Sequence, residues 1–272
     1  MQQAAFDHYG LAVRYEAWET PPSELPARLA GLHAPEVLGS NVTVPHKQAV
    51  MAAMAEIERE AAAVGAVNTI VNREGRLLGY NTDVAGCLRA LREEADCRPR
   101  GRRALLLGAG GAARAVAYGL LREGVRSLAI ANRSADRART LAREMASLWA
   151  SAPVRVVAWQ EAALAAAARE SDVIVNATTL GMWHGPAEGE TPLAAEAIPA
   201  GAAVLDLVYN PPDTPLLQAA RAAGATAING LPMLVYQGAE SFRLWTGLEA
   251  PVEAMRAAAA GALSVQRGRE RA

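Results

Sequence analysis

The sequence predicts an α/β protein of two domains, the second of which is a doubly wound parallel sheet. Three observations support this fold class: the length of 272 residues, the regular alternation of strand and helix patterns from Ala104 onward, and a glycine-rich turn directly after the first of those strands. The length suits two domains of about 100–200 residues each. We expect the first domain over residues 1–100, the second over residues 101–230, and C-terminal helices over residues 231–272 that pack back on the first domain.

The composition is that of an ordinary soluble globular protein, with 51% hydrophobic and 20% charged residues. A net charge of −1 provides no field for nucleic acid or an anionic membrane, so we expect neither as a partner. The two cysteines, Cys87 and Cys97, and the four scattered histidines have no metal-ligand spacing, and no metal is expected. Residues 1–7 lack the pattern of an export signal, and no later span is long and uncharged enough to cross a bilayer. These features predict a metal-free cytoplasmic protein.

The first hundred residues carry strand and helix patterns separated by turn residues. The expected helices cover residues 1–10, 23–32 and 45–64, and a further helix begins at Asp83. The expected strands cover residues 11–18, a segment ending in 41–44, and residues 65–72 and 77–82. A hairpin through Glu74-Gly75 joins the last two strands, and the polar segment 96–103 is expected to be the linker.

The second part of the chain alternates regularly between strand and helix, which predicts the doubly wound parallel sheet. The expected strands are Ala104–Leu107, Leu128–Ala131, Val154–Ala158, Val173–Asn176, Val204–Val208 and Ala225–Ile228. The expected helices begin near Ala112, Ala135, Glu161 and Pro215. Two more helices follow at residues 231–246 and 251–263, and the arginine-rich end, residues 267–272, is expected to be a frayed tail.

The glycine-rich turn is typical of a dinucleotide site of the Rossmann type. It consists of Gly108, Ala109, Gly110, Gly111 and Ala112, after a run of leucines and at the start of a helix. In such a turn the first glycine permits the tight bend, and the second lets a diphosphate approach backbone N–H groups at the positive helix end. We expect Gly108 and Gly110 to have these roles, the alternative being a turn without a ligand.

The residues after the next strand indicate which dinucleotide binds. This strand ends at Asn132, Arg133 and Ser134, where NAD-binding chains commonly offer a carboxylate to the ribose hydroxyls. Arg133, with Arg137 one turn later, can instead bind a 2′-phosphate, which predicts NADP. The alternative is that both arginines are simply solvated residues at the start of a helix. Thr178, at the end of a later strand, is placed to contact the nicotinamide ribose or serves as a turn residue.

Lys47 is the only lysine among 27 basic residues, all others being arginine. An arginine keeps its proton at any working pH, whereas a lysine amine can release and regain one. Lys47 follows a strand-like Val-Thr-Val and a proline, at the kind of strand end where α/β enzymes place polar groups against ligands. We therefore expect Lys47 to transfer a proton, the alternative being an ordinary surface lysine.

Several motifs together resemble the shikimate dehydrogenase family over nearly the whole chain. In order they are residues 41–47, 65–69, 81–83, 108–112 and 206–210, followed by 230–233 and 236–238. The resemblance implies NADPH-dependent reduction of 3-dehydroshikimate to shikimate on the route to aromatic amino acids and chorismate. A small-molecule substrate is thus expected, and the oligomeric state stays open between monomer and homodimer.

The resemblance also implies residue roles. The family's catalytic lysine and aspartate correspond to Lys47 and Asp83, and its substrate-binding residues correspond to Thr43, Asn68, Asp83, Tyr209 and Gln237. Its cofactor residues correspond to the turn Gly108–Ala112 and to residues 132–137, with Leu207 and Gly230 near the nicotinamide. Lys47 suits this chemistry. Hydride delivery to a ketone leaves an alkoxide, and an ammonium beside it can stabilise the negative charge and donate the proton. The alternatives are an N-cap for Asp83, a packed aromatic for Tyr209, and turn and helix-surface residues for Asn68 and Gln237.

One feature departs from the family pattern. Its members open with a strand and a Ser-x-Ser pair for the substrate carboxylate, ahead of the helix that holds Ala-Ala-Phe, whereas here Ala4-Ala5-Phe6 stands near Met1. We therefore expect this chain to begin late, with one strand fewer in the first sheet and weaker shikimate binding. The alternative functions are a quinate/shikimate dehydrogenase that uses NAD or NADP, and a non-catalytic NADP-binding relative.

Overall fold

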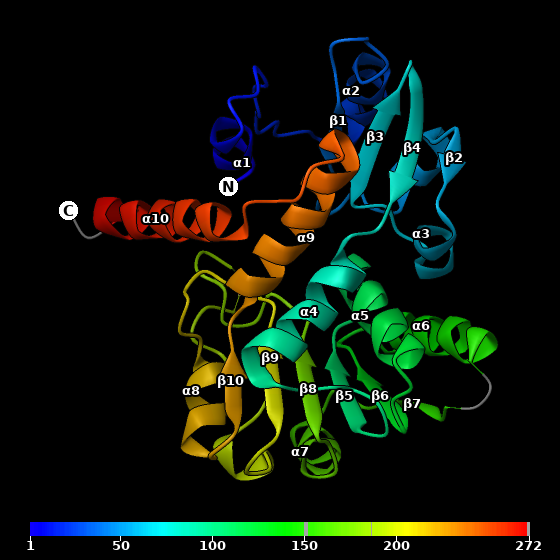
Figure 1. Cartoon of the computed structure of the whole chain (residues 1–272). Helices are drawn as coiled ribbons and strands as arrows, with labels where there is room; N and C mark the ends of the chain where they lie inside the picture. Colours follow the sequence, from blue (N-terminus) through cyan, green and yellow to red (C-terminus); the bar gives the residue numbers. More distant parts are fainter. Residues whose placement is uncertain (150–151, 186, 271–272) are drawn as a thin grey trace. The chain divides into compact units, whose positions relative to one another are not determined.

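The computed structural model describes residues 1–149, 152–185 and 187–270, and the chain divides into two compact units (Figure 1). Unit 1 comprises Met1–Gly86 and Val235–Ala272, and unit 2 comprises Cys87–Leu234. The divisions fall inside two helices, α4 (Asp83–Ala95) and α9 (Gly230–Thr246), whereas we had expected a linker at residues 96–103. None of the described helices has the length and apolar character needed to cross a membrane.

Unit 1 contains a four-stranded sheet in the order β1-β3-β4-β2, formed by β1 (Gly39–Asn41), β2 (Glu56–Ile57), β3 (Thr69–Arg73) and β4 (Arg76–Tyr80). β3 and β4 form the expected hairpin, and its turn residues Glu74 and Gly75 both have positive φ, 52° and 79°, as a tight two-residue turn requires. Val67, Ile70 and Leu77 are fully buried and pack with Leu29 and Val50 beneath the sheet.

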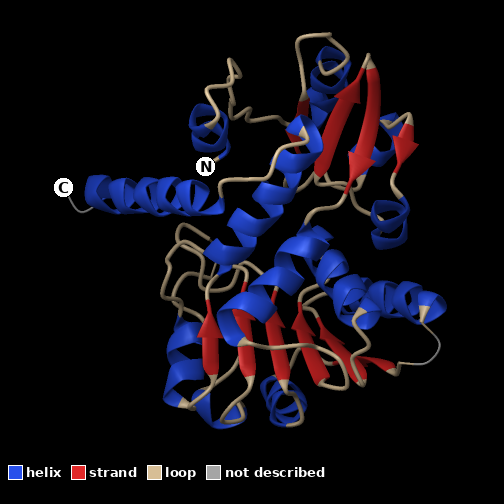
Figure 2. Ribbon diagram, in the orientation of Figure 1, coloured by secondary structure: helices blue, strands red, loops and turns tan. Residues whose placement is uncertain are grey.

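Helices complete unit 1 (Figure 2). They are α1 (Gln2–His8), α2 (Leu25–Gly31), α3 (Arg59–Val64), the unit's parts of α4 and α9, and α10 (Val252–Glu270), with short 3₁₀ turns at Pro22–Glu24 and Ala49–Ala53. The indole N–H of Trp245 on α9 donates to the Ile70 carbonyl on β3 at 2.9 Å, and Phe242 packs near Phe6 with ring centroids 5.3 Å apart. α10 continues past the expected end at residue 263 into the segment predicted to be frayed, of which residues 271–272 lie outside the described part.

The strand expected at residues 11–18 is wrong, because this segment forms no ladder. The side chain of Gln3 takes over the bonds that a neighbouring strand would make: its Nε2 donates to the Val13 carbonyl at 3.0 Å and its Oε1 accepts from the Tyr15 N–H at 2.8 Å. Alternation of apolar residues alone does not supply a pairing edge, so the segment follows α1 as an extended loop.

The helix expected over residues 45–64 is also wrong. The Ala55 N–H donates to the Leu77 carbonyl and the Glu58 N–H to the Gly79 carbonyl, so residues 55–58 pair with the edge of β4 and cannot continue a helix. The helix α3 then starts afresh, because the Glu58 carboxylate caps it by accepting from the N–H groups of Glu60 and Ala61.

Unit 2 is a six-stranded parallel sheet in the order β10-β9-β8-β5-β6-β7. Its strands are β5 (Arg103–Leu107), β6 (Ser127–Ala131), β7 (Val154–Val157), β8 (Val173–Asn176), β9 (Ala203–Asp206) and β10 (Thr226–Ile228). Its helices include α5 (Gly111–Arg122), α6 (Ala135–Leu148), α7 (Glu161–Arg169) and α8 (Pro215–Ala222). This is the strand order of a Rossmann-type sheet, and it confirms the predicted fold class.

The register of hydrophobic residues explains why the strands of unit 2 were predictable. Leu105 and Leu107 pack into one cluster with residues of α7 and α8, while Leu106, which points to the opposite face, is also fully buried. Strands covered on both faces read as continuous apolar runs. β9 ends two residues earlier than expected, because the Asp206 carboxylate turns back to accept from the Val208 N–H.

Candidate active site and cofactor-binding turn

Lys47 and Asp83 form an ion pair within unit 1. The Lys47 Nζ lies 2.6 Å from the Asp83 Oδ2, and their side chains are 13% and 7% exposed. Lys47 lies in the turns after β1, where its backbone carbonyl accepts from the Val67 N–H at 2.8 Å. This bond ties the lysine's backbone to the residues that lead into β3, so the amine is held beside the carboxylate by main-chain structure as well as by charge.

Asp83 is the first residue of α4, yet its carboxylate is occupied by side chains. Oδ2 accepts from Lys47, and Oδ1 accepts from the Asn68 Nδ2 at 2.8 Å. The backbone N–H of Asp83 donates to the Asn81 Oδ1 at 3.1 Å. The carboxylate is therefore oriented by two side chains. This arrangement fits a role in positioning the Lys47 ammonium better than it fits a role as a simple helix cap.

Asn68 is the centre of a buried polar cluster. Its Oδ1 accepts from the Thr82 N–H at 2.7 Å, which fixes the orientation of the amide. Its Nδ2 then faces Asp83, the Thr82 hydroxyl at 2.9 Å and the Gln237 Oε1 at 3.3 Å. Four of the residues expected from the sequence, Asn68 with Lys47, Asp83 and Gln237, thus belong to one continuous network.

The second half of this cluster was not among the residues expected from the sequence. The hydroxyls of Thr69 and Ser241 lie 2.8 Å apart, Ser241 and Thr82 are 3.2 Å apart, and the Asn41 Nδ2 donates to Ser241 at 3.0 Å. Asn41, Thr69 and Thr82 belong to the motifs on which the family resemblance rests, so their position in those motifs could have identified them as site residues. Ser241 could have been found from its position one helical turn after Gln237, whose carbonyl accepts from its hydroxyl.

Two expected substrate residues are not part of the cluster as the structure describes it. Thr43 is exposed, and its carbonyl accepts from the His46 N–H. Tyr209 belongs to unit 2 and is 39% exposed. A role for either in substrate binding stays a prediction.

The glycine-rich turn of unit 2 leads from β5 into the N-terminus of α5, and its two glycines Gly108 and Gly110 differ in what the backbone requires. Gly108 has a φ of +117°, and a Cβ there would lie 2.7 Å from the Ala177 carbonyl oxygen, so the backbone itself requires glycine. Gly110, the residue before α5, has an ordinary φ of −88°, and a Cβ there would meet nothing within 4 Å. Neither conformation nor packing of the described residues demands glycine at 110, and the open space in front of the helix N-terminus suits a bound diphosphate.

The end of β6 presents the expected basic residues. Arg133 and Arg137 are exposed, and in the described part of the chain neither forms an ion pair, whereas nearby Asp136 pairs with Arg139 at 2.7 Å. Asn132 donates from Nδ2 to the Ser134 carbonyl and shapes the turn into α6. The two guanidiniums are therefore available to an anionic group at this corner of the sheet.

A second polar network lies at the carboxyl ends of β8 and β9. Asp206 is fully buried and accepts hydrogen bonds from Asn176, Val208 and Thr214. Burial nevertheless raises the pKa of the Asp206 carboxyl to about 6, and these hydrogen bonds oppose the rise only in part. Asn176 in turn accepts from the backbone and hydroxyl of Thr178.

Leu207 and Gly230, two further residues expected to contact the cofactor, lie against each other next to this network. A Cβ on Gly230 would lie 2.3 Å from the Leu207 carbonyl oxygen, so a glycine is needed there for the two backbones to approach. The Gly230 N–H donates to the Val208 carbonyl at 3.1 Å. This bond holds the start of α9 against the loop that follows β9.

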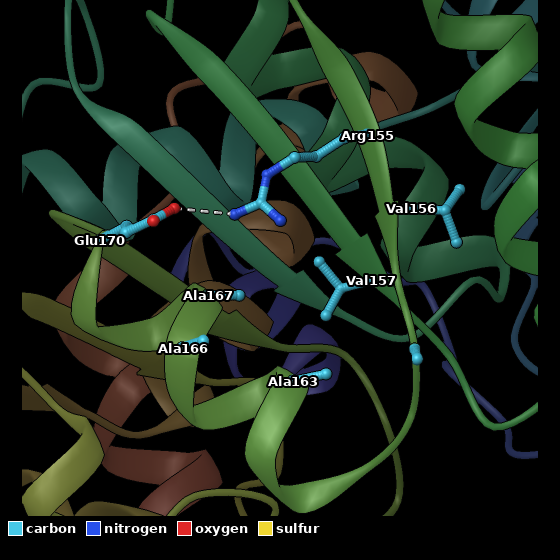
Figure 3. A pocket seen from close by; sticks show the side chains of 8 residues that line it. Arg155, Val156, Val157, Ala163, Ala166, Ala167 and Glu170 are labelled. Carbon is cyan, nitrogen blue, oxygen red and sulfur yellow. Dashed lines mark hydrogen bonds and ion pairs between the residues drawn. The ribbon is translucent and has the colours of Figure 1, made fainter.

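A hollow on unit 2 lies away from all of these residues (Figure 3). It is lined by Val157 of β7 and by Ala163, Ala166 and Ala167 of α7, and the ion pair of Arg155 with Glu170 crosses it at 3.1 Å. It contains none of the residues expected to bind substrate or cofactor. Its two charged side chains are already paired with each other, and the rest of its lining is apolar.

These features define a class of protein: an α/β chain with a Rossmann-type dinucleotide unit and a separate unit that carries a buried lysine–aspartate pair among amides and hydroxyls. Three family descriptions match the chain, namely the shikimate dehydrogenase substrate binding domain over residues 1–70, shikimate/quinate 5-dehydrogenase over residues 91–181, and the shikimate 5′-dehydrogenase C-terminal domain over residues 230–260. The chain belongs to the shikimate dehydrogenase family.

Individual relatives are similar over most of their length. The NADP(+) shikimate dehydrogenase of Methanopyrus kandleri is 46% identical over 95% of this chain and 88% of its own, and that of Moorella thermoacetica is 48% identical over 94% and 85%. Among solved structures, shikimate 5-dehydrogenase from Thermus thermophilus in complex with NADP(H) and shikimate has a TM-score of 0.84 and 41% identity, over 96% of this chain and 92% of that one.

Proposed function

We propose that this protein catalyses the reversible, NADPH-dependent reduction of 3-dehydroshikimate to shikimate, a step of chorismate and aromatic amino-acid biosynthesis. The observation that carries the proposal is the buried pair of Lys47 and Asp83, 2.6 Å apart and oriented by Asn68, in a chain of this family. A lysine so held can supply a proton at a defined point, which is what reduction of a ketone requires besides the hydride.

The residues of unit 2 fit NADPH, which supplies the hydride when bound. Gly110 leaves open space before the N-terminus of α5 for the diphosphate, while Arg133 and Arg137 offer two exposed guanidiniums to the 2′-phosphate. Thr178, Leu207 and Gly230, at the ends of β8 and β9 and the start of α9, would border the nicotinamide half.

Lys47 acts at the substrate oxygen. As the carbonyl carbon is reduced, negative charge develops on its oxygen, and the ammonium of Lys47 stabilises that charge and donates the proton. Asp83 accepts a hydrogen bond from the ammonium and keeps it aimed, and its remaining lone pairs can accept from a substrate hydroxyl. Asn68 and Gln237 provide neutral hydrogen bonds for the other hydroxyls, and we assign Thr43 and Tyr209 to the same task.

The test is an assay of the purified chain with NADP and shikimate, following NADPH absorbance, with quinate and NAD as competing substrate and cofactor. We expect turnover with NADP and shikimate to exceed turnover with either replacement. Higher turnover with quinate or with NAD would favour a quinate/shikimate dehydrogenase of broader cofactor use, and binding of NADP without any turnover would favour a non-catalytic relative.

Asp83→Asn tests the pair itself. The amide keeps the size of the side chain but removes the charge that holds the Lys47 ammonium, so we expect kcat to fall by about tenfold or more. Lys47→Met, which removes the amine and keeps much of the length, serves as the comparison. If Asp83→Asn leaves kcat intact and lowers only the melting temperature, Asp83 is a helix cap and not part of the reaction.

A further inference from the structure

The carboxylate of Asp206 has no part in the chemistry given to Lys47 and Asp83, yet it is fully enclosed at the end of β9. Its Oδ1 accepts from the Asn176 Nδ2 at 2.9 Å and from the Val208 N–H at 3.0 Å, and its Oδ2 accepts from the Thr214 hydroxyl at 2.6 Å. One side chain therefore connects the end of β8, the loop after β9 and the start of α8. Enclosing a carboxylate is costly unless such donors surround it.

Asn176 passes this constraint on to Thr178. Its Oδ1 accepts from the Thr178 N–H at 3.1 Å and from the Thr178 hydroxyl at 2.7 Å. Because the Nδ2 donates to Asp206, the amide cannot turn over without losing bonds on both sides. The carboxylate of Asp206 thus selects the amide orientation that holds Thr178.

The sheet order places this network under one half of a dinucleotide. In a Rossmann-type sheet the ligand crosses the carboxyl ends of the strands at the point where the strand order reverses, which here lies between β5 and β8. The proposed 2′-phosphate site at Arg133 puts the adenosine half at the end of β6, so that β8 and β9 lie on the side of the nicotinamide half. The Ala177 N–H donates to the Leu107 carbonyl at 2.7 Å, and a Cβ on Gly108 would lie 2.7 Å from the Ala177 carbonyl oxygen, so the loop of residues 176–178 lies directly against the glycine-rich turn.

We infer that Asp206 is a positioning residue for the nicotinamide half of the dinucleotide, acting through Asn176 on Thr178 and through Val208 on the loop that contains Leu207. The inference rests on the proposed use of NADP and deepens it. Asp206 acts by holding two backbone segments in place, so its loss should affect one half of the ligand and not the other.

The experiment compares two probes by calorimetry, NADP itself and adenosine 2′,5′-bisphosphate, which lacks the nicotinamide half. For Asp206→Ala and for Asn176→Ala we expect the affinity for NADP to fall by about tenfold or more, while the affinity for the bisphosphate stays within about twofold. Ser171→Ala is the matched control, because it removes another buried hydroxyl bond of unit 2, to the Ala167 carbonyl, before β8. This control should bind both probes as the wild type does.

The steady-state constants provide a second readout. We expect the KM for NADP to rise in both variants while the KM for shikimate changes by less than about twofold. Asn176→Ala keeps the bonds of Asp206 to Val208 and Thr214, so it serves if Asp206→Ala fails to fold. Equal loss of both probes, or no loss of NADP, in a folded variant would overturn the inference. The binding experiment needs no shikimate, so it tests the inference separately from the proposed activity. If the wild-type chain shows no turnover of shikimate but the variants lose affinity for NADP and not for the bisphosphate, the inference holds and the proposed activity is wrong.

Discussion

At the scale of single residues, the proposed proton transfer depends on residue 47 being a lysine. An amine and a guanidinium bring the same charge to the Asp83 carboxylate, but they differ in whether a proton can leave. The chain uses arginine at every other basic position, so the difference between the two side chains can be tested at a single site.

Lys47→Arg should keep much of the substrate binding and lose most of the turnover, because guanidinium does not readily give up a proton. The measurement is kcat and KM for shikimate at saturating NADP. We expect kcat to fall by more than about tenfold, a barrier increase above about 1.4 kcal/mol. A variant that keeps more than about a tenth of the wild-type kcat would show that the proton comes from elsewhere.

Replacing both Arg133 and Arg137 with Ala should erase the preference for NADP over NAD. Each charge-assisted bond to the 2′-phosphate contributes about 1.5–3 kcal/mol, and both side chains are exposed, so the fold should not suffer. The check is the ratio of kcat/KM for the two cofactors. Arg139→Ala is a suitable control, since that guanidinium pairs with Asp136. If the double variant still prefers NADP by about tenfold, other residues bind the phosphate.

At the scale of secondary-structure elements, the turn between β5 and α5 contains one glycine that the fold requires, Gly108, and one that only a bound ligand would require, Gly110. The fold itself requires glycine at 108, because the φ of this residue is +117° and a Cβ there would lie 2.7 Å from the Ala177 carbonyl oxygen. Gly110 has neither constraint. The two positions thus allow a paired experiment within one turn.

Gly108→Ala should lower the melting temperature, and Gly110→Ala should leave it nearly unchanged while it weakens NADP binding. A methyl at 108 would meet backbone at 2.7 Å, whereas a methyl at 110 enters only the space proposed for the diphosphate. Calorimetry and thermal denaturation of both variants give the comparison. Unchanged NADP affinity in Gly110→Ala would mean that the diphosphate does not approach this residue.

Elements also differed in how far the sequence could predict them. The parallel strands of unit 2 were predicted within about two residues at each end. For the central strands β5, β6, β8 and β9 the reason is burial on both faces, which leaves an almost uninterrupted apolar run. The helix over residues 45–64 was not predicted correctly, because the pairing of residues 55–58 with β4 is a contact between distant segments. Local periodicity cannot reveal which edge of a sheet will be free to pair.

At the scale of the whole molecule, Asp206 links stability to pH. Its folded pKa of about 6 lies above the ordinary value of 3.8, and burial, not a charged neighbour, is the cause. Between these two values the folded state binds more protons than the unfolded one, so this group's contribution to stability is present at low pH and is lost as pH rises through about 6. The difference corresponds to roughly 3 kcal/mol at most.

Asp206→Asn should remove this pH dependence, since the amide imitates the protonated acid: its oxygen can still accept and its nitrogen can donate to the Thr214 hydroxyl. Relative to the wild type, the variant should become more stable as pH rises from about 4 to about 7. Denaturant unfolding of both proteins across this range measures the difference. A constant difference at all pH values would mean that Asp206 does not titrate there.

Local patterns were enough to predict the fold class, the glycine turn with its two arginines, and Lys47 as a candidate for proton transfer, whereas Asp83, Asn68 and Gln237 became candidates through the resemblance to the shikimate dehydrogenase family. These follow from local signals: apolar periodicity, residues with special backbone freedom, and short motifs read in order. A lone lysine among arginines is also visible without any structure.

Which polar groups are buried together depends on contacts between distant segments, and these contacts exist only in the folded chain. Asn41 and Ser241 lie 200 positions apart, and Thr69 and Ser241 lie 172 apart, yet they bond at 3.0 and 2.8 Å within the cluster around Asn68. The same holds for Asp206, whose burial and three donors appear only when β8, β9 and α8 are packed. The energetic significance of a polar side chain depends on its loss of water and on its partners, and both are properties of the folded chain.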